Sequence, residues 1–246
     1  MEIHYCTDYD EMSQRACDRL ITVLKDKPNT LLCPTKGASP MGFYRQLVAH
    51  YKKDPHIFKE LAIIKQDEWG GIPASDPNSC ETYLKTLLIE PLGISEDRYI
   101  SFESSPVDAK KESNRMDNEI QERGPIDVCI LGMGKNGHLG FNEPAKHLIP
   151  HCHIAELSPT SLMGSMTKNM THPPNYGLTL GMAAILQSKE IIFLLSGEGK
   201  KEAIKELLKK EVTPYLPASF LWLHPNVHCY LDRDSVQWEG TPYNNK

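Results

Sequence analysis

Stretches with apolar residues at helical spacing alternate with short, continuously apolar stretches along the whole chain. The first carries Met12, Ala16, Leu20 and Leu24 at every fourth position, which is typical of an amphipathic helix with one buried face. On these grounds we predict helices at 7–27, 40–51, 79–90, 106–123, 182–187, 199–210 and 218–223. Strands are predicted at 30–33, 61–65, 99–101, 126–131, 152–157, 190–195 and 227–231, with a strand or a turn at 176–180.

Continuously apolar strands between amphipathic helices indicate a mostly parallel sheet that is covered on both faces. We therefore predict an α/β protein, a three-layer αβα arrangement with a doubly wound, Rossmann-like central sheet. The 246 residues show no internal repeat and no linker, and a chain of this length can bury a full core without disulfides or a structural metal. We expect a single domain over residues 1–246.

Composition and charge exclude several classes of partner. The net charge is −5 and no basic block stands out, so we expect no nucleic-acid partner. The longest apolar stretches, such as 191–195, are far shorter than the roughly 20 residues that span a bilayer, so no membrane partner is expected. The N-terminus lacks a basic start followed by an apolar run, which favours a cytoplasmic protein.

The seven cysteines, an odd number without a Cys-x-x-Cys pair, indicate reduced, mostly buried thiols in a cytosolic protein. The segment 151–153, His-Cys-His, invites a metal interpretation. However, alternate residues of a strand point to opposite faces, and no second Cys/His cluster supplies the further ligands that a metal requires. We therefore expect no metal.

In an open parallel sheet, ligands bind beyond the carboxyl ends of the strands, and four such junctions carry polar residues. In the first, a Gly-containing turn precedes a helix, so Gly37, Ala38 and Ser39 can offer donors to a phosphate, with the Lys36 ammonium beside them. An ordinary cap, with Ser39 at the N-cap, is the alternative. In the last, 196–201, Lys200 can reach the same crevice, although the Walker A spacing is absent.

The second junction places Asp67 and Glu68 next to Trp69 and two glycines. An aromatic wall can raise the pKa of a carboxyl group toward that of a general base, whereas an exposed pair would simply be solvated. We interpret this junction as a candidate source of a catalytic base.

The third junction, GMGKNGHLGFNEP at 132–144, contains the pattern G-x-G-x-x-G. The dinucleotide fingerprint needs a helix to begin there, and Gly140 and Pro144 break the segment, so we reject a dinucleotide site. His138, Glu143 and Asn136 instead favour proton transfer near a polar ligand. A turn with incidental polar residues is the alternative.

Taken in order, these segments resemble the glucosamine-6-phosphate deaminase and 6-phosphogluconolactonase family over nearly the whole chain. The most specific matches are DEWGGIP at 67–73, GKNGHLGFNEP at 134–144 and GEGK at 197–200, supported by PASFLWLHP at 217–225. Within the family, these segments are more similar to the galactosamine-6-phosphate branch than to the glucosamine enzymes.

The resemblance implies an aldose–ketose isomerisation coupled to loss of ammonia, without metal or organic cofactor, on a small sugar phosphate. The galactosamine branch would convert galactosamine 6-phosphate to tagatose 6-phosphate. By the resemblance, His138 assists ring opening, Asp67 moves a proton from C2 to C1, and Glu143 orients His138. The phosphate ligands it implies are Gly37, Ala38 and Ser39, with Lys200 opposite; Lys36 remains a candidate from the loop itself.

Three departures from the family pattern affect the expected site. Asn136 stands where the deaminases usually carry Asp; it can accept a hydrogen bond from the imidazole of His138 but cannot stabilise the imidazolium by charge. Lys36 replaces the usual Thr. The segment 158–175 lacks the usual phosphate-binding Arg, and Lys168 is the nearest candidate to replace it.

Two rival functions share this fold. A 6-phosphogluconolactonase has no need of Glu143, and its loop resembles GxDGHTAS, so the sequence Asn142-Glu143-Pro144 favours the deaminase. A non-catalytic sugar-phosphate sensor occurs with a DNA-binding domain, for which we expect no room because the first predicted helix leads directly into the first predicted strand. The sequence leaves open the galacto or gluco preference and whether the chain forms a homo-oligomer.

Overall fold

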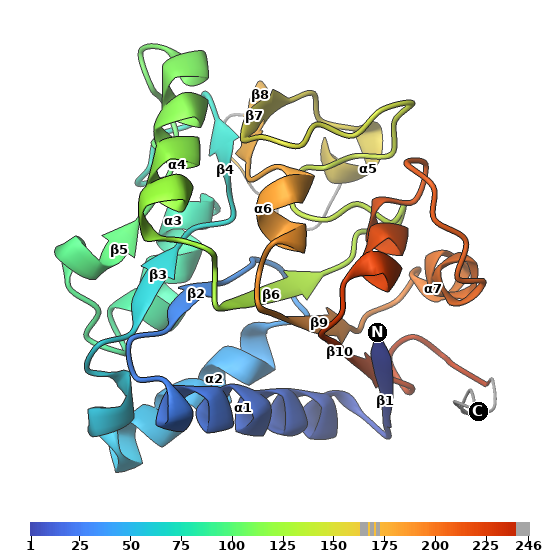
Figure 1. Cartoon of the computed structure of the whole chain (residues 1–246). Coiled ribbons are helices and arrows are strands. Elements are labelled where there is room, and N and C mark those ends of the chain that lie inside the picture. Colours follow the sequence, from blue (N-terminus) through green and yellow to red (C-terminus); the bar gives the residue numbers. More distant parts are fainter. Residues whose placement is uncertain (163–166, 168–169, 171–172, 240–246) are drawn as a thin grey trace.

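The computed structural model describes the chain except for residues 163–166, 168–169, 171–172 and 240–246. Its centre is a seven-stranded sheet in the order β1–β10–β9–β6–β2–β3–β5, in which every neighbouring pair is parallel (Figure 1). The strands are β1 (Glu2–Cys6), β2 (Leu31–Cys33), β3 (Ala62–Ile64), β5 (Tyr99–Ile100), β6 (Val128–Gly132), β9 (Glu190–Leu195) and β10 (Val227–Asp232). All except β1 overlap a predicted strand.

Helices cover both faces of this sheet. On one face lie α1 (Tyr9–Asp26), α2 (Met41–Lys53), α3 (Cys80–Leu84) and its continuation η2 (Lys85–Ile89). On the other lie α4 (Ala109–Arg123), α6 (Met182–Leu186), α7 (Lys201–Leu208) and η4 (Pro217–Leu223). The remaining helical segments are η1 (Pro55–Phe58), η3 (Glu96–Arg98) and α5 (Pro159–Leu162). The three-layer α/β architecture is therefore confirmed.

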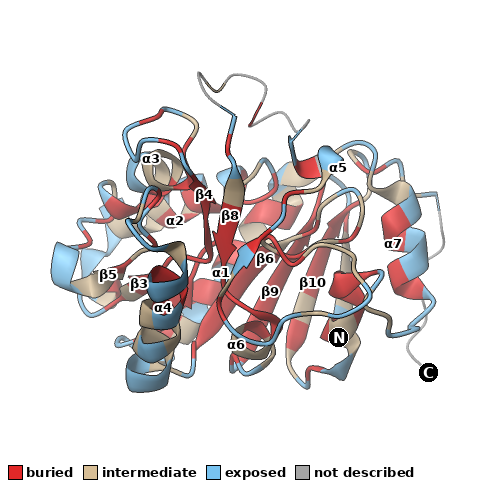
Figure 2. Ribbon diagram, turned by 90° about the horizontal axis from the view of Figure 1, so that it is seen from above, coloured by how far each residue is buried: buried red, intermediate tan, exposed pale blue. Residues whose placement is uncertain are grey.

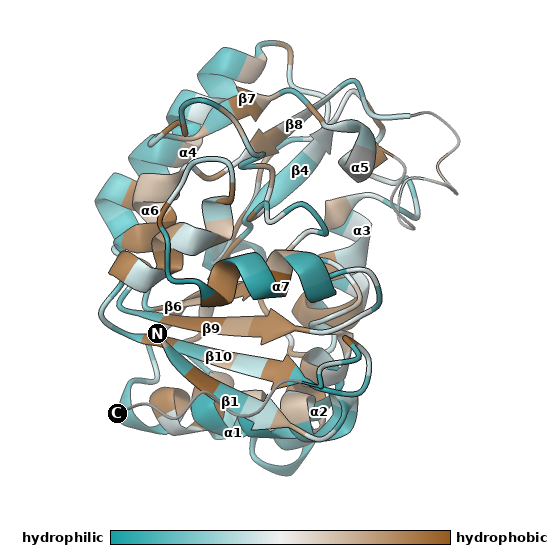
Figure 3. Ribbon diagram, turned by 90° about the vertical axis from the view of Figure 1, so that its right-hand side faces the viewer, coloured by the Kyte–Doolittle hydropathy of each residue, from teal (hydrophilic) through white to brown (hydrophobic). Residues whose placement is uncertain are grey.

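Strand β9 shows why both faces must be covered. All its residues are buried, and they alternate between the two cores: Ile192 and Leu194 face α1, whereas Ile191 and Phe193 face the opposite layer. Buried residues accordingly concentrate on the central strands (Figure 2). In the hydropathy view, β9 is hydrophobic and lies beneath α7, which is largely hydrophilic (Figure 3).

A second, three-stranded sheet was not predicted. It is antiparallel and has the order β4–β8–β7, with β4 at Asp67–Gly70, β8 at Tyr176–Thr179 and β7 at His153–Ala155. The prediction treated 67–71 as a loop because Asp-Glu-Trp-Gly shows neither a continuous nor an alternating apolar pattern. Its extended form depends on pairing with β8, more than a hundred residues away in the chain, which local periodicity does not reveal.

The N-terminal segment also differs from the prediction. Strand β1 precedes the first helix and pairs with β10 at the edge of the sheet. The first strand of the chain therefore lies before the first helix, whereas the prediction placed it after. Asp8, not Thr7, is the N-cap of α1, and its Oδ1 accepts the Glu11 N–H at 2.8 Å. Polar and apolar residues alternate only over 2–5 in β1, whereas the predicted strands were continuously apolar runs, so this short edge strand was not predicted.

Two expectations from composition can be compared with the structure. All seven cysteines are buried and none forms a disulfide, as predicted. Across the described part of the chain, no helix combines the length and the apolar character needed to cross a membrane.

Candidate active site

A cavity of about 250 Å³ opens at the carboxyl ends of the central strands. Its wall is formed by 35–39 after β2, by Asp67 and Trp69 of β4, by residues between 132 and 141 after β6, and by Ser161 and Lys200. The four junctions singled out in the sequence therefore meet at one pocket. This is the position that a parallel α/β sheet favours for a ligand.

Asp67 presents a buried carboxyl group to this pocket. Asp67 is only 4% exposed, and its Oδ1 lies 3.5 Å from the thiol of Cys80. Burial raises the pKa of Asp67, and the positive charge of Lys36 opposes that rise. A carboxyl group with a raised pKa in a pocket is suited to act as a general base.

The neighbouring Glu68 has a structural environment instead. Its Oε1 accepts the backbone N–H groups of Trp69 (2.8 Å) and Cys80 (3.0 Å), and its Oε2 accepts Glu81 N–H (2.9 Å) and the Lys65 ammonium (2.8 Å). Two of these N–H groups belong to the first turn of α3, where helical donors lack partners. Because successive residues of β4 point to opposite sides, Asp67 faces the pocket and Glu68 points away from it.

His138 and Glu143 form a pair in the loop after β6. The imidazole Nδ1 lies 3.3 Å from Glu143 Oε2. The Ser161 hydroxyl donates to Glu143 Oε1, and the Asn136 amide donates to Oε2 at 2.9 Å. Burial would raise the pKa of Glu143, but its contacts with His138, Ser161 and Asn136 lower it to about 2. Glu143 is therefore an anion next to the imidazole, whose buried Nδ1 makes no hydrogen bond among the described residues.

Asn136 does not make the contact that the sequence suggested. We expected its side chain to accept a hydrogen bond from the imidazole of His138. Instead its Oδ1 accepts the backbone N–H of His138 at 3.3 Å, and its Nδ2 donates to Glu143. Between Asn136 and His138 the chain turns at Gly137, which has a φ of +88° and donates its N–H to Gly134 O.

The loop requires glycine where it meets the imidazole. A Cβ at Gly134 would lie 2.2 Å from His138 Cε1, closer than two carbon atoms can approach without displacement. The ring therefore lies against bare backbone.

Ser39 and Lys200 form the polar end of the pocket. Lys200 Nζ donates to Ser39 Oγ at 3.2 Å, and the Ser196 hydroxyl donates to the same atom at 2.9 Å. Burial, together with the positive charge of Lys135, lowers the pKa of Lys200 to about 8. Ser39 is not a helix cap, because the N-cap of α2 is Pro40 without a side-chain cap bond. The alternative of an ordinary Ser39 cap is therefore wrong.

Lys135 is a pocket residue that the sequence analysis missed. It lines the cavity, and its Nζ would lie 3.1 Å from a Cβ placed at Gly199, so it approaches the turn before Lys200. The available signal was its place beside Gly134 in the glycine-rich loop. Two clustered lysines indicate a site for an anion such as a phosphate. The predicted ligand Lys168 lies outside the described residues.

Lys36 contributes a cation at a different position. Its Nζ lies 3.3 Å from the centroid of the Trp69 ring and 4.8 Å from that of Phe141, which is a cation–π arrangement. Among the described residues this buried ammonium has no hydrogen-bond partner. Its contacts therefore place Lys36 with Trp69 and the Asp67 carboxylate, whereas Lys200 is held by Ser39.

Comparisons with known proteins agree with this fold. The family model described as glucosamine-6-phosphate isomerases/6-phosphogluconolactonase matches residues 7–229. The chain is 40% identical over 225 residues, 92% of its length and 89% of the relative's, to AgaI of Escherichia coli (strain K12), which is only provisionally named a deaminase. It is 31% identical over 238 residues, 96% of its length and 94% of the relative's, to the glucosamine-6-phosphate deaminase of Thermoanaerobacter pseudethanolicus (strain ATCC 33223 / 39E).

A solved structure of a monomeric glucosamine-6-phosphate deaminase superimposes with a TM-score of 0.90 at 30% identity, covering 97% of this chain and all of the other. The fold and these matches thus define a class of α/β enzymes that act on sugar phosphates. The chain belongs to the glucosamine-6-phosphate isomerase and 6-phosphogluconolactonase family.

Proposed function

We propose that this protein is a hexosamine-6-phosphate deaminase that releases ammonia and forms a ketose 6-phosphate. The observation that carries the proposal is one pocket lined by the buried carboxylate of Asp67, the imidazole of His138 and the Ser39–Lys200 end, with Glu143 next to His138. The relatives named as deaminases support the same activity.

Each group has a chemical task in this proposal. His138, held by Glu143, moves a proton to the ring oxygen as the pyranose opens. Asp67 removes the C2 proton and returns it at C1 through a cis-enolamine, which leaves an imine at C2. Water adds to that carbon, ammonia leaves, and a ketone remains. Positioned acid–base groups typically contribute about a hundredfold or more each, so side chains suffice for the proton transfers.

The phosphate of the substrate would occupy the polar end of the pocket. Gly37, Ala38 and Ser39 lie just before α2, whose N-terminal N–H groups and dipole favour an anion. Lys200 and Lys135 add two positive charges at the same end. Lys36, beside Asp67, would lie closer to the reacting carbons.

We propose galactosamine 6-phosphate as the preferred substrate, with tagatose 6-phosphate as the product. The support is the amino-acid sequence of the site loops and the 40% identity to AgaI. Glucosamine 6-phosphate is the second candidate, favoured by the relatives named glucosamine-6-phosphate deaminase. The two sugars differ only at C4.

Ammonia release with the two hexosamine 6-phosphates, measured side by side, tests both statements. We predict ammonia release from galactosamine 6-phosphate, and from glucosamine 6-phosphate either a lower kcat/KM or no release. Preference for the gluco epimer would overturn the choice of substrate alone. No ammonia from either sugar would overturn the deaminase activity, and hydrolysis of 6-phosphogluconolactone by the same sample would favour the lactonase.

A further inference from the structure

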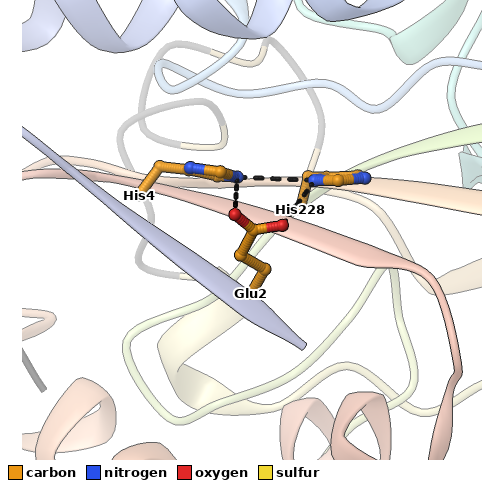
Figure 4. A group of neighbouring side chains, drawn as sticks. All are labelled: Glu2, His4 and His228. Carbon is orange, nitrogen blue, oxygen red and sulfur yellow. Dashed lines mark hydrogen bonds and ion pairs between the residues drawn. The ribbon is translucent and has the colours of Figure 1, made fainter. Parts of the chain in front are cut away.

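A cluster of three side chains lies on the edge of the central sheet, away from the pocket. Glu2 and His4 project from β1 and His228 from β10 (Figure 4). The parallel register places Glu2 opposite His228 and His4 opposite Tyr230, so all these side chains share one face. Glu2 and His228 lie at the amino-terminal ends of their strands, whereas the pocket lies at the carboxyl ends.

The ligand atoms of the cluster have the spacing of a metal site. His4 Nε2 lies 3.4 Å from His228 Nδ1. Glu2 Oε1 lies 3.7 Å from His4 Nε2, and Glu2 Oε2 lies 3.5 Å from His228 Nδ1. With metal–ligand bonds of about 2.0–2.1 Å, two ligands of a tetrahedral ion lie about 3.3–3.4 Å apart. Within the described residues, this is the one group of three such side chains whose ligand atoms converge.

We propose that Glu2, His4 and His228 bind a divalent transition-metal ion, with Zn²⁺ as the best fit. Two imidazoles and one carboxylate are a common protein donor set for Zn²⁺, with a fourth position left for water. Mg²⁺ and Ca²⁺ prefer all-oxygen ligands, so this set disfavours them.

A neighbouring aromatic ring positions the imidazole of His4. The His4 ring stacks on Tyr230 with centroids 4.7 Å apart, which fixes its orientation.

Two arginines of α1 face the cluster and would repel a cation if unpaired. Arg15 is paired with Glu11 at 3.2 Å, and Arg19 binds Glu190 through two hydrogen bonds of 2.6 and 2.7 Å. Their charges are therefore largely balanced by carboxylates.

The ion would join the edge strand to its neighbour. Two of its ligands belong to β1 and one to β10, so binding requires the two strands to be paired. Because a ligand that binds only the folded state stabilises it, the ion would raise the melting temperature without entering the pocket. The proposal is thus independent of the proposed deaminase activity.

The test uses the full chain without an affinity tag, stripped of metal with EDTA. Zn²⁺ titrated by calorimetry should bind at one ion per chain and raise the Tm, while Mg²⁺ should do neither. His4→Gln and His228→Gln should weaken Zn²⁺ binding by at least about 100-fold, beyond what loss of an outer-shell partner costs. His153→Gln, from the His-Cys-His segment, is the matched control and should bind like the wild type.

Two results would overturn the metal site. One is absence of Zn²⁺ binding to the wild type, which would leave the 3.4 Å contact as a hydrogen bond between the two imidazoles. The other is equal affinity in wild type and His4→Gln. If a histidine variant does not fold, Glu2→Gln decides the question, because the Glu2 side chain is 58% exposed and its loss should also weaken binding.

Discussion

At the scale of single residues, two adjacent acids show how environment assigns function. Asp67 and Glu68 are both buried. Glu68 uses both oxygens to bind Lys65 and three backbone N–H groups, while Asp67 has the Cys80 thiol as its recorded hydrogen-bond partner. The carboxylate with fewer partners in the protein is the one left to take a proton from a substrate.

Lys36 should control the pH at which Asp67 becomes active. Its charge opposes the burial that raises the pKa of Asp67, so Lys36→Met should raise that pKa further. The acid limb of kcat/KM should therefore move to higher pH, because Asp67 must be deprotonated to act as a base. Lys36→Arg keeps the charge and is the control. An unchanged acid limb in Lys36→Met would contradict this electrostatic role.

Lys200 should set an alkaline limit on substrate binding. Its pKa of about 8 means that the ammonium is charged below that pH and neutral above it. Inhibition by inorganic phosphate, followed from pH 6 to 10, should therefore weaken above about pH 8. Lys200→Arg stays charged over this range and should remove that weakening. A wild type with pH-independent phosphate inhibition would argue against a Lys200–phosphate contact.

At the scale of elements, strand β4 joins the two sheets and carries the proposed base. It follows β3 after only Lys65 and Gln66, and it pairs with β8. The Lys65 ammonium, which is 1% exposed, binds Glu68, Glu81 and the Phe102 carbonyl. This buried ion network therefore ties β4 to α3 and fixes the position of Asp67.

Glu68→Gln should accordingly destabilise the protein strongly. It removes one partner of a buried cation, a change that typically costs about 3–5 kcal/mol, and the remaining bonds of Lys65 to Glu81 and Phe102 favour the lower end. Urea unfolding measures the change in free energy. Glu202→Gln, an exposed residue paired with Lys205, is the control and should unfold like the wild type. Equal stability of the two variants would contradict the structural role of Glu68.

The sequence predicted the elements that form by local pattern and missed those that form by pairing. Helix α7 and strand β9 followed from apolar spacing, because each buries a face that its own residues define. Strands β1 and β4 depend on distant partners. In the site, the four junctions were found because parallel strands end at one edge, whereas the contact of Asn136 with Glu143, seven residues further on, has no sequence signal.

At the scale of the whole molecule, the two sheets divide the work of the fold. The parallel sheet delivers the loops with Ser39, His138 and Lys200 to one edge, and the antiparallel sheet holds Asp67 over them. The opposite ends of β1 and β10 carry the proposed metal site, so catalysis and metal binding can be tested separately.

The most direct test of the proposed mechanism is ammonia release by Asp67→Asn, with inorganic phosphate affinity measured on the same sample. Asn has nearly the same shape as Asp but cannot take up the C2 proton. We predict a loss of turnover of about 100-fold or more, with phosphate affinity unchanged because Ser39 and Lys200 remain in place. Turnover within a few-fold of the wild type would contradict the role of Asp67 as the base.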